Sequence, residues 1–197
     1  HFGIDEEEYV FLYVFDFLSG FERKNPMAAI QAFREAFRSD EPVRLVLKCI
    51  NGDKDPENFD LLKEAAKGAR VTVINDYFSK DEKNGLISIC DCYLSLHRSE
   101  GFSLTIAEAM FLEKPVIATG WSGNMDFMTV SNSFPVEFDL VELSRDHGPY
   151  KSGNVWAQPD TRHAAGLMRR VYEEPLDAKK KAGKAAADMR QKHSPAV

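Results

Sequence analysis

The sequence predicts an α/β fold in which a doubly wound parallel sheet is flanked by helices on both faces. Short apolar segments alternate along the chain with segments whose apolar residues recur at helical spacing. A chain of 197 residues with 44% hydrophobic content is long enough for one such Rossmann-like domain, whereas two full domains would be cramped. We place this domain at residues 9–175, after a short segment 1–8 and before a C-terminal helix and tail at 176–197.

The first strand and helix open the domain. Residues 10–17 form an apolar run rich in β-branched and aromatic side chains, which is too short for an ordinary helix and predicts a buried strand. A turn follows, and Asn25-Pro26 then supplies a helix N-cap with proline in the first turn. The helix buries a stripe at helical spacing, made of Ile30, Phe33 and Phe37.

The next strands and helices repeat this pattern. A second strand is expected at 43–50, closed by the turn Asn51-Gly52-Asp53, and a helix at 58–67 ends at Gly68. A third strand covers 71–74 and precedes a helix at 79–89 that begins with a serine N-cap. A fourth strand at 92–96 leads into a loop at 97–101, a helix at 104–112 and a fifth strand at 115–119. Parallel sheets of this kind bind ligands at the carboxyl ends of their strands.

The last third of the chain is less regular. Residues 135–152 combine glycine, proline and scattered charges, which predicts a long loop or lid. Trp156 is expected to be a packing anchor. A helix follows Pro159-Asp160, and a final, more exposed helix covers 177–192.

Composition and charge exclude several classes of function. The net charge of −6 and the pI near 5.4 argue against a nucleic-acid partner, which normally meets a basic surface. Cys49, Cys90 and Cys92 lack the spacing of zinc or redox motifs, so we expect reduced core thiols in a cytoplasmic protein. No apolar run suggests a membrane span, no leader opens the chain, and the start at His1 suggests a fragment or a trimmed chain.

The segment 99–110, Ser-Glu-Gly-Phe-Ser-Leu-Thr-Ile-Ala-Glu-Ala-Met, carries the chemistry. Glu100 lies on the loop after the fourth strand and Glu108 lies one turn into the next helix, so both can face one ligand. Gly101 permits close approach of the backbone. The free N–H groups at the start of that helix form a cradle for phosphate oxygens, supplied by Phe102, Ser103, Leu104 and Thr105. Carboxylates for vicinal hydroxyls beside amides for a diphosphate match a nucleotide sugar.

Other loops at the same edge of the sheet supply further candidates. Arg23 and Lys24 follow the first strand and can neutralise a leaving diphosphate, although such residues taken alone are more often ordinary surface cations. Tyr77 or Phe78 can stack on the base or, alternatively, pack in the core. His97 contacts the sugar or phosphate or, alternatively, has a structural role at the strand end. The glycine-containing loop 119–126 either closes over the ligand or is a simple turn, and the remaining histidines have no metal-ligand spacing.

Together these pieces resemble the retaining glycosyltransferases of group 1, family four, over nearly the whole chain. The most specific part is the Glu100-x7-Glu108 motif followed by Lys-Pro-Val-Ile-Ala-Thr. The resemblance implies the C-terminal half of a GT-B fold, with residues 1–8 as the remnant of an interdomain linker. It assigns Glu100 to the donor sugar or its phosphate side and Glu108 to the ribose hydroxyls. The family uses an arginine and, five residues later, a lysine for the diphosphate; Lys24 matches the lysine, whereas Ser19 occupies the arginine position and Arg23 can supply the missing charge.

The same resemblance implies the reaction. A sugar passes from a UDP- or GDP-linked donor to an acceptor hydroxyl with retained anomeric configuration, without a bound metal or other cofactor. Glu100 and Lys24 are the candidate catalytic residues. The acceptor is a saccharide, lipid or polysaccharide, bound largely by an N-terminal domain that is absent from this chain.

Three alternatives stay open. The chain is either the donor-binding part of such an enzyme, a non-catalytic nucleotide-sugar-binding module, or part of a GT-B sugar epimerase or phosphorylase. A phosphorylase would need a cofactor lysine context that the sequence lacks. The basic segment 179–184 either touches the inner face of a membrane or forms a solvated helix face.

Overall fold

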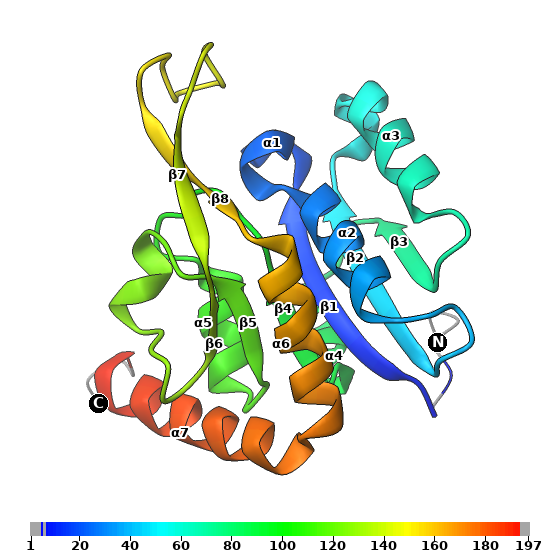
Figure 1. Cartoon of the computed structure of the whole chain (residues 1–197), viewed down its shortest axis with the longest axis vertical. Helices are drawn as coiled ribbons and strands as arrows, with labels where there is room; N and C mark the ends of the chain where they lie inside the picture. Colours follow the sequence, from blue (N-terminus) through cyan, green and yellow to red (C-terminus); the bar gives the residue numbers. More distant parts are fainter. Residues whose placement is uncertain (1–4, 6, 194–197) are drawn as a thin grey trace.

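In the computed structural model, residues 5 and 7–193 are described, and within them a parallel six-stranded sheet forms the centre of the fold (Figure 1). The strand order is β3-β2-β1-β4-β5-β6, and every neighbouring pair is parallel. The strands are β1 (Tyr9–Asp16), β2 (Val43–Ile50), β3 (Val71–Asn75), β4 (Cys92–Ser95), β5 (Val116–Thr119) and β6 (Phe134–Val136). The predicted doubly wound Rossmann-like fold is confirmed. The predicted linker segment falls mostly on residues 1–4 and 6, which lie outside the described part of the chain.

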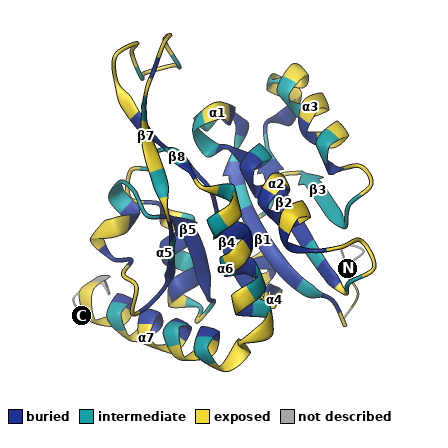
Figure 2. Ribbon diagram, in the orientation of Figure 1, coloured by how far each residue is buried: buried dark blue, intermediate teal, exposed yellow. Residues whose placement is uncertain are grey.

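Helices cover both faces of this sheet. On one face, buried side chains of α2 (Pro26–Ala36), α3 (Pro56–Ala66) and α6 (Thr161–Glu173) pack against the alternate residues of β1 and β2. On the other, α4 (Lys80–Ile89), α5 (Leu104–Phe111) and the C-terminal part of α7 (Pro175–His193) do the same. The inner strands of the sheet are largely buried, the edge strand β3 is half-buried, and exposure is concentrated on the outer helix faces and the β7–β8 hairpin (Figure 2). Burial on both sides explains why the strands are continuous apolar runs.

The segment predicted to be a long loop, 135–152, is partly strand, which corrects that prediction. It contains most of β6 and all of β7 (Phe138–Glu142), which pairs antiparallel with β8 (Val155–Pro159) in a hairpin that projects from the sheet (Figure 1). β6 is only three residues long and β7 is largely exposed, so neither has the apolar pattern of a buried strand. Trp156 is buried, in agreement with a packing anchor.

The turn after β1 also differs from its prediction. It holds a 3-10 turn η1 (Phe17–Ser19) and a one-turn helix α1 (Phe21–Lys24). Asn25 is the N-cap residue of α2 and Pro26 opens its first turn, as predicted, but Asn25 adopts a left-handed conformation with φ of 53° and its side chain forms no capping hydrogen bond. Its buried Nδ2 instead donates to the carbonyl oxygen of Leu96 at 3.0 Å, which ties α1 to the end of β4. Asparagine tolerates this backbone conformation better than most residues do.

The three cysteines are buried free thiols, as expected for core residues. Burial raises the pKa of both Cys49 and Cys90 to about 12, which keeps these thiols protonated. None of the helices in the described residues combines the length and apolar character that a membrane-crossing helix needs.

Candidate functional site

The candidate site lies where the chain reverses direction along the sheet. After β3 the chain returns past β1 to form β4, so the loops after the adjacent strands β1 and β4 diverge and leave a crevice at their carboxyl ends. One loop contributes Ser19, Arg23 and Lys24, and the other contributes Glu100 and Gly101. The structure therefore brings together predicted site residues that are about 76 positions apart in sequence.

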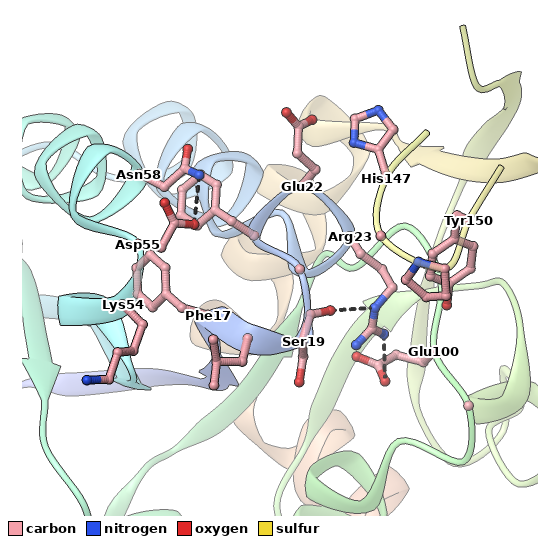
Figure 3. A pocket seen from close by; sticks show the side chains of 16 residues that line it. Phe17, Ser19, Glu22, Arg23, Lys54, Asp55, Asn58, Glu100, His147 and Tyr150 are labelled. Carbon is pink, nitrogen blue, oxygen red and sulfur yellow. Dashed lines mark hydrogen bonds and ion pairs between the residues drawn. The ribbon is translucent and has the colours of Figure 1, made fainter. Parts of the chain in front are cut away.

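Glu100 is the electrostatic centre of this crevice. Its Oε1 accepts a hydrogen bond from Nζ of Lys24, and its Oε2 lies 3.3 Å from a guanidinium nitrogen of Arg23. Figure 3 shows the contacts of Arg23 with Ser19 and Glu100. Arg23 donates to the carbonyl oxygens of Ser19 at 2.9 Å and Ser99 at 2.7 Å, so it links the two loops. The three charged side chains are only 10–14% exposed. Charges so shielded from water interact more strongly than surface pairs.

The cations decide the protonation state of Glu100. Burial by itself raises the pKa of this carboxyl, but the charge and hydrogen bond of Lys24, with a smaller contribution from Arg23, outweigh it. The pKa of Glu100 therefore lies below its usual value, and the group is a carboxylate at neutral pH. It can accept hydrogen bonds but cannot donate a proton there.

The loop between β5 and β6 holds the backbone of Glu100 in place through two hydrogen bonds. The Oγ of Ser122 accepts a hydrogen bond from the backbone N–H of Glu100 at 2.8 Å, and the N–H of Gly123 donates to the carbonyl oxygen of Glu100 at 3.3 Å. Gly123 opens the 3-10 turn η3 (Gly123–Asp126), and a Cβ at this position would overlap the carbonyl oxygen of Gly101. This glycine is therefore required for the close approach of the two loops.

The N-terminus of α5 opens onto the same crevice. Ser103 precedes the helix with φ of 61°, and its side chain forms no cap. Its buried Oγ has no hydrogen-bond partner among the described residues. The backbone N–H groups of Leu104 and Thr105 likewise meet no acceptor in the described part of the chain, while Phe102 and the Leu104 side chain are exposed. Such unpaired N–H groups favour an anion.

Glu108 faces α4 from the second turn of α5. Both of its carboxylate oxygens accept hydrogen bonds from Nζ of Lys83, at 2.6 and 2.8 Å, and the two side chains are 27–30% exposed. Glu100 lines the outer side of the crevice, whereas Lys83 lines a second pocket deeper in the site. The two glutamates of the motif thus lie beside different pockets.

Two adjacent pockets make up the crevice. The outer cleft has a volume of about 690 Å³ and lies between the β1 loop, α3 and the hairpin tip (Figure 3). The inner pocket, of about 260 Å³, is bounded by the ends of β1 and β2 and the loop after β3. Ser19 lines both. The inner pocket is lined by Val14, Phe15, Asp16, Ser19, Lys24, Lys48, Ile50, Tyr77, Phe78, Lys83 and Thr105.

Tyr77, the predicted base-stacking residue, lines the inner pocket and is largely exposed to solvent. Its ring is 67% exposed, and its hydroxyl group donates to Oδ1 of Asn51. Asn51 in turn donates to Oδ1 of Asp16 at 2.7 Å. This chain of hydrogen bonds fixes the orientation of an aromatic ring that is otherwise open to solvent.

His97 has the structural role rather than a ligand contact, which corrects its inclusion among the binding residues. Its ring is completely buried. Nδ1 lies 3.0 Å from Oγ of Ser95, and Nε2 lies 3.1 Å from Oδ1 of Asn124 and 3.3 Å from the carbonyl oxygen of Trp121. Burial lowers the pKa of His97, so the ring is neutral and its Nε2–H donates to these acceptors. It links the β4 loop to the loop after β5.

Sequence reasoning missed two parts of the site. The tip of the β7–β8 hairpin contributes His147 and Tyr150 to the outer cleft, although a lid was expected in this region (Figure 3). Arg98 anchors the hairpin: its Nε donates to Gln158 at 2.9 Å and its guanidinium lies 5.2 Å from the ring centre of Trp156. The second omission is Lys48, hidden within the apolar run of β2. Within the described residues, no group of three or more His, Cys, Asp and Glu side chains is placed to hold a metal ion.

Comparisons with known proteins identify relatives of this arrangement. The sequence profile of glycosyl transferases group 1 matches residues 1–132, about two thirds of the chain. No curated protein matches the sequence significantly.

Solved structures share the fold. HepE of Anabaena, in complex with UDP and glucose, is 18% identical with a TM-score of 0.69, over 94% of this chain and 44% of HepE. The C-terminal domain of LpcC, a glycosyl transferase group 1 family protein of Francisella tularensis, is 16% identical with a TM-score of 0.70. The match covers 95% of this chain and 87% of the LpcC domain. Sucrose-phosphate synthase of Thermosynechococcus elongatus is 18% identical with a TM-score of 0.71, and the match covers 95% of this chain and 42% of the synthase. The chain therefore spans less than half the length of HepE and of the synthase.

Proposed function

The chain belongs to the glycosyl transferases group 1 family, and we propose that it is the donor-binding part of a retaining glycosyltransferase that needs no metal ion. The donor is a UDP- or GDP-linked sugar. The acceptor is a saccharide, lipid or polysaccharide bound by a second, N-terminal domain. We place the enzyme in the cytoplasm, at the inner face of a membrane if its acceptor is a lipid.

One observation carries this proposal. Lys24 lines the inner pocket, while its Nζ is hydrogen-bonded to Glu100, which lines the outer cleft. A cation at the junction of two pockets, beside unpaired N–H groups of α5, suits a ligand whose negative charge lies in its middle. A nucleotide sugar has this form, with the nucleoside in the inner pocket, the diphosphate at the junction and the sugar in the outer cleft.

Each group then has a defined task. Glu108 accepts hydrogen bonds from the ribose hydroxyls, Tyr77 stacks on the base and Glu100 contacts the sugar or its phosphate side. The bond between the anomeric carbon and the diphosphate oxygen breaks, and the acceptor oxygen bonds to the same face of that carbon. The acceptor proton passes to the departing diphosphate. Lys24 and the α5 N–H groups stabilise the charge that develops on the leaving group, which is the task of a metal ion in other transferases.

Calorimetric titration of the chain with UDP, GDP and ADP, in the presence of EDTA, tests this function. We expect one nucleotide to bind without metal and its affinity to fall at least tenfold, about 1.4 kcal/mol, in Glu108→Gln. Glu113→Gln is the matched control, because Glu113 pairs with Arg190 on the surface, away from the pockets. Absence of binding by all three nucleotides, or equal binding by both variants, would remove the basis of the proposal.

A further inference from the structure

Lys48 is a buried cation that the proposed reaction does not use. It lies on β2, and the residue is only 3% exposed. Its Nζ donates to the carbonyl oxygen of Cys49 at 3.0 Å and to the carbonyl oxygen of Asp76, at the ends of β2 and β3. Within the described residues, no carboxylate lies within ion-pair distance of this ammonium group, in contrast to Lys24 and Lys83.

Burial of an ammonium group costs free energy unless polar partners replace the water that it loses. Removal from water lowers the pKa of Lys48, whereas the charge of Asp76 acts more weakly in the opposite direction. An ammonium group has three N–H donors, and backbone carbonyls use two of them. No third hydrogen bond of this ammonium group lies within the described residues; the side chain lines the inner pocket, where Nζ lies 4.3 Å from the ring centre of Phe78 in a cation–π contact.

The surroundings of Lys48 match a flat heterocycle rather than a phosphate. Val14 and Ile50 give the pocket apolar walls, and the exposed ring of Tyr77 lies at its edge. The proposed diphosphate cradle is formed by Lys24 and the start of α5, and Ser19, which lines both pockets, joins the inner pocket to the outer cleft. A buried N–H donor between apolar walls selects ligands by the hydrogen-bond acceptor that they place against it.

We propose that Lys48 selects the nucleobase, by donating its third N–H to an exocyclic carbonyl oxygen of the base. This inference rests on the proposed function. It assigns the donor to nucleotides whose base carries a carbonyl group at that edge, such as O4 of uracil or O6 of guanine. Adenine and cytosine present an amino group there, which would oppose donor to donor and leave the third N–H of the ammonium group without a hydrogen-bond acceptor.

Paired nucleotides test this selection on the unmodified protein. UDP differs from CDP, and IDP from ADP, chiefly in a carbonyl group that replaces an amino group. In calorimetric titrations we expect the carbonyl member of the pair that binds to be favoured at least tenfold. Equal affinities within both pairs, or a preference for the amino member, would overturn the inference while leaving metal-free nucleotide binding intact.

Lys48→Met provides the second arm, because methionine keeps most of the volume and removes the charge. We expect Lys48→Met to bind the carbonyl-bearing nucleotide more weakly, so that the preference within the pair shrinks to about threefold or less. Inorganic pyrophosphate and ADP should bind to this variant as they bind to the unmodified protein. Lys114→Met is the control, since its Nζ also donates to a backbone carbonyl, that of Ser88, but lies outside both pockets.

The outcomes separate the two hypotheses. An equal loss for all nucleotides and for pyrophosphate in Lys48→Met would mean that Lys48 only holds the ends of β2 and β3 in place. If Lys48→Met does not fold, the pairs measured on the unmodified chain still decide the inference. Failure of every nucleotide to bind the unmodified chain would instead overturn the proposed function together with the role of Lys48.

Discussion

The Nζ of Lys83, on α4, donates to both carboxylate oxygens of Glu108, on α5, at 2.6 and 2.8 Å. The carboxylate keeps further lone pairs for ligand hydroxyls, so Lys83 orients Glu108 without using all of its hydrogen-bond acceptor sites. We predict that Lys83→Met weakens binding of the preferred nucleotide two- to fivefold, less than Glu108→Gln does. Calorimetry on both variants measures this order. A loss in Lys83→Met as large as that in Glu108→Gln would mean that Lys83 itself binds the nucleotide.

Gly123 is predicted to tolerate no side chain. A Cβ there would overlap the carbonyl oxygen of Gly101, so Gly123→Ala must push the Glu100 loop away. We expect the free energy of unfolding to fall by about 2 kcal/mol or more. Gly166→Ala is the matched control: this helical glycine has open space around it, and alanine should stabilise α6 by about 0.5–1 kcal/mol. Urea denaturation compares the two, and an unchanged stability in Gly123→Ala would contradict the tight contact.

Ser103 is predicted to be a poor residue for its position. Its left-handed backbone, with φ of 61°, favours glycine, and its buried hydroxyl has no partner among the described residues. Ser103→Gly should therefore raise the free energy of unfolding by about 1 kcal/mol. Ser103→Ala removes only the hydroxyl and should gain less. Thermal and urea unfolding of the two variants separate these contributions, and a gain confined to Ser103→Ala would show that the backbone is unstrained.

Glu8 is predicted to contribute to the decrease in the free energy of unfolding at acid pH. It accepts hydrogen bonds from Arg44 at 2.6 and 2.8 Å and also pairs with Arg70. The hydrogen bonds from Arg44 lower the pKa of Glu8 from 4.5, against the effect of burial. A lowered pKa stabilises the fold above pH 4.5, and this stabilisation is lost as the pH falls through the pKa of the folded state.

Replacement of this carboxylate tests the linkage. Glu8→Gln should lower the free energy of unfolding at pH 7 by about 1–3 kcal/mol and flatten its decline between pH 5 and pH 3. Glu113→Gln, on an exposed ion pair, should change neither. Urea denaturation at a series of pH values measures both quantities. If the free energy of unfolding declined with falling pH as steeply in Glu8→Gln as in the unmodified protein, the pH dependence would come from other carboxylates.

Local sequence pattern was enough to predict most of the central sheet and most of the candidate site residues. Four of the six parallel strands, β1, β2, β4 and β5, are buried on both faces, and they and the half-buried edge strand β3 are short, mainly apolar runs that local pattern reveals. The motif around Glu100 and the cation Lys24 could be placed on loops at the carboxyl ends of strands, because strand and helix alternate without interruption. The short strand β6 and the two strands of the projecting hairpin, β7 and β8, lack this pattern, and the sequence analysis predicted none of the three.

Only the tertiary structure decided which partner each polar group has. The pairing of Glu108 with Lys83, the burial of His97 and the support of Glu100 by Ser122 join segments 22–27 residues apart. Lys48 is a buried charged residue inside a mainly apolar strand, and its significance depends on the pocket that β1, the loop after β3, α4 and α5 form with it. Local periodicity records which face of an element is buried, because burial follows the repeat of the backbone. Pair geometry depends on how the chain returns to itself, which no local pattern contains.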